Sequence, residues 1–433
     1  MEAAIPKREI RRNFALTVFN GALFNFAVRL IDPPLVLTWF VSQLTPSNLL
    51  VGLVAPWSQA CWFLPQVFVS NRIQRMERKM TSYSLTGMIR VGVWLLLAAV
   101  IWFVDVPRLL LPGFFILSGI AWATGGLAGL SFFDVVAKTI PTRRRGSLFA
   151  WRQFLGGLLG LGAGWVVKTV LDDAAYPFPR GHAVLFLLYG ATILLAMGAF
   201  IAIREPRGEP VADTLSLREQ LGRASRVLKE DDAYRRYLGA RLSLGLSEVA
   251  LPFYGVYAKR VLGAPEGMVG VYVAARVFAQ MFFNLPWGWL SDRRGNQVVM
   301  RLMSIGGGLA ALMGIGLVAV VDAMHLEGGW VPYLALPLFL LNGAVLPGKI
   351  LSGSNYVLEM ASETERSLYV GLSNTLMGIV VLISGVGGLV VDLAGFAGLF
   401  ALSAGLCIIA YVLAKRLPRT RETAGEPGPD THV

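Results

Sequence analysis

The chain has 433 residues, of which 55% are hydrophobic and only 15% charged, and its mean hydropathy is +0.60. This composition excludes a soluble globular domain and predicts an integral membrane protein. The formal net charge of +12 would suggest nucleic-acid binding in a soluble chain. Here the basic residues lie in short segments between apolar runs, a pattern that fixes membrane topology, so we expect no nucleic-acid partner.

Apolar runs of about 20 residues, long enough to cross a bilayer, recur along the whole chain. The segment before the first run is polar and basic without a cleavable signal pattern, so the first run is expected to remain as a membrane helix. We predict twelve transmembrane spans, over residues 13–42, 47–70, 82–104, 109–136, 147–171, 183–203, 236–260, 267–290, 297–321, 331–357, 367–391 and 394–414. The expected fold class is an all-α membrane protein.

Basic residues cluster in alternate connections between these spans. One set of connections carries groups of Lys and Arg, for example around Arg72, Lys138 and Lys415, whereas the other set carries few basic residues beside acids such as Asp172. Because positively charged loops stay on the cytoplasmic side, both termini are expected in the cytoplasm, and the protein in the inner membrane.

The longest internal connection covers residues 204–235 and divides the chain into two halves. Its 215–228 portion predicts an amphipathic helix on the inner leaflet surface, and residues 416–433 predict a disordered tail. The halves, residues 1–203 and 236–415, form a weak repeat with an offset of about 218 residues, the kind of internal symmetry found in transporters. For example, residues 44–52 correspond to residues 262–270.

The stretch 288–297 reads Gly-Trp-Leu-Ser-Asp-Arg-Arg-Gly-Asn-Gln and lies between spans eight and nine. It resembles the G-x-L-A-D-R-x-G-R-K loop signature of the major facilitator superfamily of secondary transporters. The match departs at Asn296 and Gln297, where that family usually has basic residues. Residues 71–79 look like a degraded first copy, with Gln74 in place of the acid.

The resemblance implies twelve helices in two pseudo-symmetric six-helix halves that carry a small organic solute by alternating access. It implies transport without a cofactor, by a monomer surrounded by membrane lipid, with protons as a candidate coupling ion. The alternatives from other classes are a transport-inactive receptor and a membrane enzyme on the same scaffold. An enzyme would need a convergent acid/base or nucleophile cluster, and a receptor would need a sizeable soluble domain.

In the family's fold, the loop after span eight lies against the start of span five, and the loop after span two against the start of span eleven. An acid at Asp292 would then meet the positive amino end of span five, whereas basic residues of the first copy would meet acids before span eleven. The expected cytoplasmic gate consists of Gly288, Asp292, Arg293, Gly295, Arg75, Arg78, Arg145, Glu363 and Glu365.

Ionisable groups inside apolar spans are costly to hold there, so each is a candidate for solute binding or coupling. Arg29 and Asp32 share one face of span one, before Pro33 and Pro34, which should weaken that helix. Arg241 and Glu248 share one face of span seven. Each of these two pairs either neutralises itself in a structural role or contributes to the central cavity. Glu248 is the first candidate for a proton carrier.

Further interior side chains could bind or stack on a solute. Arg90 and Arg276 are additional cations, which favour an anionic or zwitterionic solute. The polar and aromatic candidates are Asn25, Trp57, Tyr254 and Asn342. Any of the four polar and aromatic residues could equally hold neighbouring helices together.

Three other patterns in the sequence resemble parts of known sites. Residues 343–349 fit the start of a phosphate-binding P-loop, but Ile350 stands where Ser or Thr should hold magnesium, and the segment lies in a span. The positions of the Cys and His residues predict no metal site and no catalytic centre: Cys61, Cys407, His182, His325 and His432. A glycine stripe in span five indicates close helix packing or an antiporter-like helix: Gly156, Gly160 and Gly164.

Overall fold

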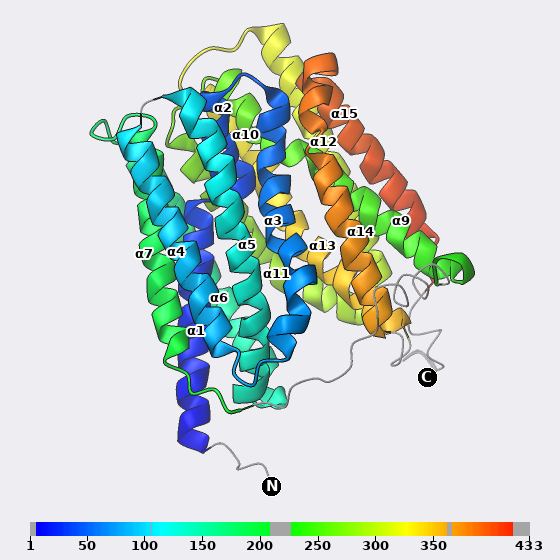
Figure 1. Ribbon diagram of the computed structural model, residues 1–433. Helices are drawn as coiled ribbons and strands as arrows, with labels where there is room; N and C mark the ends of the chain where they lie inside the picture. Colours follow the sequence, from blue (N-terminus) through cyan, green and yellow to red (C-terminus); the bar gives the residue numbers. More distant parts are fainter. Residues whose placement is uncertain (1–5, 105, 208–226, 362–365, 419–433) are drawn as a thin grey trace. The chain divides into compact units, whose positions relative to one another are not determined.

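The computed structural model describes residues 6–104, 106–207, 227–361 and 366–418 (Figure 1). Every regular element in these segments is a helix. Most of the predicted amphipathic linker helix lies outside the described residues, as do Glu363, Glu365 and the tail from residue 419.

The helices follow the predicted spans closely. Those before the linker are α1 (Lys7–Leu30), η1 (Pro33–Leu37), α2 (Thr38–Leu44), α3 (Asn48–Gln74), α4 (Met80–Phe103), α5 (Pro107–Thr139), α6 (Thr142–Asp172) and α7 (Arg180–Ile201). Those after it are α9 (Asp232–Leu246), η2 (Ser247–Ala250), α10 (Leu251–Arg260), α11 (Met268–Arg294), α12 (Asn296–Met324), η3 (Val331–Ala335), α13 (Leu336–Met360), α14 (Arg366–Ser384) and α15 (Gly387–Lys415).

Nine helical stretches among the described residues are long and apolar enough to cross a membrane, and Leu368–Ser384 is a shorter apolar helix. The predicted spans outside those nine fall on α3, on α9 with α10, and on α14. The twelve-span pattern therefore agrees with the structure, and the chain is a multi-pass, all-α membrane protein.

Two predicted spans are interrupted near their middle. In span one, α1 ends at Leu30, and the π-helical turn η1 begins at Pro33, because proline lacks the N–H that would continue the α-helical bonding. In span seven, the 3₁₀ turn η2 separates α9 from α10, which has Pro252 in its first turn. The break expected from Pro33 and Pro34 is confirmed, whereas the break at η2 was not predicted.

The chain forms two compact units. The first contains Met1–Ser47, Trp57–Thr214 and Pro265–Ala274, and the second contains Asn48–Pro56, Leu215–Ala264 and Ala275–Val433. In the first unit α4 packs against α5 and α7, which are the third, fourth and sixth predicted spans. In the second unit α12 packs against α13 and α15, which are the corresponding spans of the second half.

Glycines allow close helix contacts within the first unit. A Cβ atom at Gly156 would lie 2.7 Å from the Cβ of Asn25 in α1, and one at Gly164 would lie 2.7 Å from the carbonyl oxygen of Gly270 at the start of α11. Helix packing is therefore confirmed as a role for these two positions of the glycine stripe.

Candidate functional site

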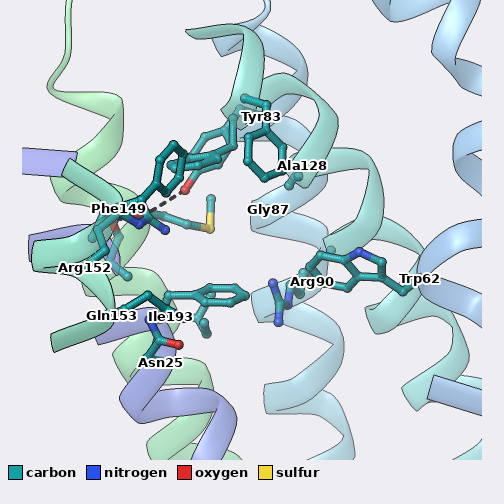
Figure 2. Close-up of a pocket in the computed structure, with 18 residues that line it drawn as sticks. Asn25, Trp62, Tyr83, Gly87, Arg90, Ala128, Phe149, Arg152, Gln153 and Ile193 are labelled. Carbon is teal, nitrogen blue, oxygen red and sulfur yellow. Dashed lines mark hydrogen bonds between the residues drawn. The ribbon is translucent and has the colours of Figure 1, made fainter. Parts of the chain in front are cut away.

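The first unit contains a cavity of about 260 Å³ lined by residues of α1, α3, α4, α5, α6 and α7. Two arginines lie in its wall, Arg90 from α4 and Arg152 from α6. Figure 2 shows Arg90 beside Trp62 and Arg152 beside Phe149, at different sides of the cavity. The cavity therefore combines two cations with aromatic walls.

Arg90 is 4% exposed and surrounded by rings. Its guanidinium carbon lies 5.3 Å from the ring centre of Phe24, 5.5 Å from that of Trp62 and 5.8 Å from that of Trp122. Its Nη2 donates to the hydroxyl of Tyr189, whereas its buried Nε has no hydrogen-bond partner among the described residues. Ring faces attract the cation but do not neutralise its charge.

Arg152 was not among the predicted site residues, although it lies inside the predicted span 147–171 and meets the criterion that selected Arg90. Its Nη1 donates to the carbonyl oxygen of Thr17 at 3.1 Å and to Oδ1 of Asn20 at 3.3 Å. Its guanidinium carbon lies 4.4 Å from the ring centre of Phe132. These contacts place the side chain across the face of α1 and against α5.

No Asp or Glu is among the residues that line this cavity, and within the described segments neither Arg90 nor Arg152 has an acidic partner. Burying a charge away from water is costly unless an opposite charge or hydrogen bonds compensate for it. The cavity is therefore electropositive and suited to an anion.

Of the two hydrogen-bonding candidates in the first half, Asn25 and Trp57, only Asn25 lines the cavity. Asn25 lines the cavity, where its Nδ2 donates to the carbonyl oxygen of Gly21 at 2.8 Å. Trp57 does not line it. The Trp57 Nε1 donates to the carbonyl oxygen of Phe115 at 2.9 Å, and its ring packs on Gly119, so Trp57 joins α3 to α5.

The second unit places Glu248 beside Lys349 rather than beside Arg241. The Nζ of Lys349 lies 3.3 Å from Oε1 of Glu248 and 3.4 Å from the carbonyl oxygen of Leu244. Tyr254 and Asn342 lie with this pair around a space of about 20 Å³. The lysine of the rejected P-loop match is therefore the partner of the predicted carboxylate.

Arg241 contacts neutral groups. Its Nη1 donates to the hydroxyl of Tyr237 at 3.0 Å and to that of Ser373, and its Nη2 donates to Oδ1 of Asn374 at 3.0 Å. A structural Arg241–Glu248 pair, one of the alternatives from sequence, does not form. Arg276 in α11 is 6% exposed, and Gly343 of α13 packs on its backbone.

Arg29 and Asp32 form an ion pair of 3.0 Å in which the Asp32 side chain is only 3% exposed. Asp32 immediately precedes η1, and Glu248 lies in η2. A carboxylate with a cationic partner thus stands at the break in the first membrane segment of each half. Discontinuous helices of this kind often mark binding sites in transporters.

The two residues that depart from the family signature begin α12, directly after the loop that follows α11. Asn296 and Gln297 are buried, and Asn296 Nδ2 donates to Oε1 of Glu359 at the end of α13 at 2.7 Å. Gly295 has a φ of +84°, a conformation that favours glycine. Gly288 precedes this loop in α11, and a Cβ atom there would meet open space.

The charged residues of the signature lie on the outside of this loop. Asp292 and Arg293 are exposed, and the guanidinium of Arg293 lies 4.6 Å from the ring centre of Trp289. The contact expected between Asp292 and span five stays a prediction.

Lys79, the last residue of the first copy of the signature, belongs to an ion-pair network. Lys79 pairs with Asp134 at 2.8 Å, and Lys138 pairs with Asp134 at 3.0 Å and with Glu205 at 2.9 Å. Arg75 and Arg78 are exposed. Arg145 donates to the carbonyl oxygens of Ile140 and Ala137, which holds the corner between α5 and α6.

Comparisons with known proteins agree with this architecture. A comparison with curated proteins gave no match. The nucleoside transporter NupG has 14% identity and a TM-score of 0.63, with 97% of this chain and 100% of that chain covered. A D-xylose-proton symporter has 16% identity and a TM-score of 0.70, with 95% and 99% covered.

A third solved structure, a POT family transporter in complex with 5-aminolevulinic acid, has 11% identity and a TM-score of 0.71, with 93% of this chain and 95% of that chain covered. At these identities the likeness concerns the fold. Residues 237–432 match the family model described as Major Facilitator Superfamily. The second half of the chain thus matches the Major Facilitator Superfamily model, and the whole chain shares its fold with solved transporters.

Proposed function

We propose that the protein is a secondary transporter that moves a small organic solute across the inner membrane by alternating access. The observation that carries the proposal is the cavity with Arg90 and Arg152 in its wall, because it is a preformed site of solute size within a transporter fold. The halves 1–203 and 236–415 would rock about a site near the membrane midplane. A monomer with both termini in the cytoplasm, driven by protons, is part of the same proposal.

Transport is tested with the purified full chain reconstituted in liposomes. The panel contains uridine as a nucleoside, D-xylose, 5-aminolevulinic acid and benzoate, and the first three follow the solute classes named for the structural neighbours. At least one radiolabelled solute should enter faster than in protein-free liposomes and exchange with its unlabelled form. Entry of all four at the protein-free rate would contradict the proposal.

The orientation gives a separate prediction. A reporter that is active only in the cytoplasm should work when fused after Lys138 or within residues 204–236, and should be silent between Asp172 and Arg180, because the basic connections stay inside. Reporter activity in whole cells, normalised to the amount of fusion protein, measures this. The opposite pattern would overturn the proposed topology.

A further inference from the structure

We infer that the cavity of the first unit binds an aromatic carboxylate, whose negative charge is attracted by Arg90 and Arg152 from different sides of the cavity and whose ring lies against the aromatic walls. The inference rests on the proposed transport function and names the class of solute. It follows from the charge of the cavity, the unused donors of the two arginines, and the chemistry of the remaining lining.

The charge of the cavity calls for an anion. Two guanidinium groups face the cavity, and no acidic side chain in the described segments compensates for them at this site. A bound carboxylate would supply the missing negative charge in a setting of low polarity, where its attraction to a cation is stronger than in water.

The arginines also have donors left for a ligand. A guanidinium has five N–H donors. Among the described residues, Arg90 donates through Nη2 to the hydroxyl of Tyr189, and Arg152 donates through Nη1 to Thr17 and Asn20. All of these acceptors are neutral. A carboxylate matches the fork geometry of the remaining donors better than a neutral carbonyl or hydroxyl group.

The rest of the lining favours an aromatic body over a polar one. Rings from five helices line the cavity: Phe24, Trp62, Tyr83, Phe132, Phe133 and Phe149. Ring pairs in offset or edge-to-face arrangements are favourable, whereas hydroxyl groups of a sugar placed against ring walls lose hydrogen bonds to water. Because the volume is about 260 Å³, below the usual range of drug-sized pockets, a single-ring or fused-ring acid suits it better than a larger molecule.

Matched acid and amide pairs test the inference directly. Benzoate and benzamide have nearly the same shape and differ in charge, as do indole-3-acetate and indole-3-acetamide. On the purified full chain, we expect at least one acid to raise the melting temperature and its amide to bind at least about tenfold more weakly. Acetate, which has the charge without the ring, should give no shift at the same concentration.

Variants connect binding to the two arginines. Arg90→Met and Arg152→Met should each weaken binding of the active acid at least about tenfold, and Arg152→Lys should recover it only in part, because an ammonium lacks the planar fork. Arg108→Met is the matched control, since Arg108 is exposed and lies outside the cavity. It should bind the acid as the unmodified protein does.

The outcomes separate this inference from the proposed function. Equal shifts for each acid and its amide, no shift with either acid, or an acid-specific shift that survives in both methionine variants would each overturn the inference. If uridine or D-xylose still crossed the liposome membrane in that case, transport would stand and the solute class would be wrong. A stronger shift with phenyl phosphate than with benzoate would replace the carboxylate by a phosphate ester.

Discussion

Glu248→Gln should abolish solute accumulation driven by a proton gradient while leaving exchange of solute at equal concentrations intact. Glu248 lies in the 3₁₀ turn η2, where its side chain is 32% exposed and pairs with Lys349 at 3.3 Å. A carboxylate that reaches both water and a poorly polar interior can take up and release a proton during the cycle. Glutamine keeps the shape of the side chain but cannot carry the proton.

The measurement compares two assays on the same liposomes. Uptake is first driven by an inward proton gradient, and then labelled solute is exchanged against unlabelled solute without any gradient. Glu77→Gln is the matched control, because Glu77 is exposed in the loop before α4. Undiminished gradient-driven accumulation in Glu248→Gln would show that Glu248 is not the carrier.

The Asp32 carboxylate provides a useful contrast. It is paired with Arg29 at 3.0 Å and is nearly inaccessible, so it has less opportunity than Glu248 to exchange protons with water. Removing one partner of a buried pair leaves the other charge uncompensated, at a cost of about 3–5 kcal/mol. We therefore expect a structural rather than a coupling role for Arg29 and Asp32.

The fold could be predicted from the sequence because a membrane helix requires a long apolar run, and such runs are visible in the sequence itself. The break before Pro33 follows from proline chemistry. The predicted boundary between the last two spans, at residues 392–393, lies beside Gly395, where α15 is kinked and φ is +66°. Each of these features depends on local sequence alone. The 3₁₀ turn at η2 has no such local signal, so span seven was read as one continuous helix.

The partner of Glu248 could not be predicted from spacing along span seven. Arg241 and Glu248 lie seven residues apart, which is about two helical turns or roughly 10 Å along the axis, so a shared face does not bring the two charged groups into contact. Lys349 comes from α13, about 100 residues later, and such a pairing depends on how the helices pack. Sequence reasoning identified the carboxylate because buried charge is informative, but the partner required the tertiary structure.

The loop after α11 also makes a contact to another helix that could not be predicted from the sequence. The residues that match the family signature, such as Asp292 and Arg293, are exposed, whereas Asn296 and Gln297 are buried. In the sequence, Asn296 and Gln297 only weaken the match to the family signature. In the structure the amide of Asn296 joins the loop to Glu359 of α13, a contact that neutral side chains can make without a second buried charge.

Gly126→Ala should strongly reduce the amount and thermal stability of folded protein, although alanine is the better helix former. Gly126 lies in α5 against the backbone of α3, where an added Cβ would overlap the carbonyl oxygen of Trp62 and lie 2.9 Å from its carbonyl carbon. That oxygen also accepts a hydrogen bond of 2.8 Å from Nε2 of Gln66. Backbone atoms cannot rotate away as a flexible side chain can, so the two helices must separate.

Gly113 offers a control in the same helix, because a Cβ atom there meets nothing within 4 Å. Gly113→Ala should be neutral or stabilising by up to about 1 kcal/mol, the usual gain in helix propensity. Gly126→Ala should instead lose about 1–3 kcal/mol, or more, through overpacking. Melting temperatures in detergent and the monodisperse fraction on gel filtration would report the difference.

Gly343 makes the same kind of close backbone contact in the second unit. A Cβ atom at Gly343 of α13 would overlap the backbone carbonyl of Arg276 in α11, so Gly343→Ala should behave like Gly126→Ala. A melting temperature of either variant equal to or above that of Gly113→Ala would show that the helices can move apart at little cost. If both variants lose stability, the close backbone contact between these paired helices is a requirement of the fold in each unit, and Trp62 is held in the cavity wall by it.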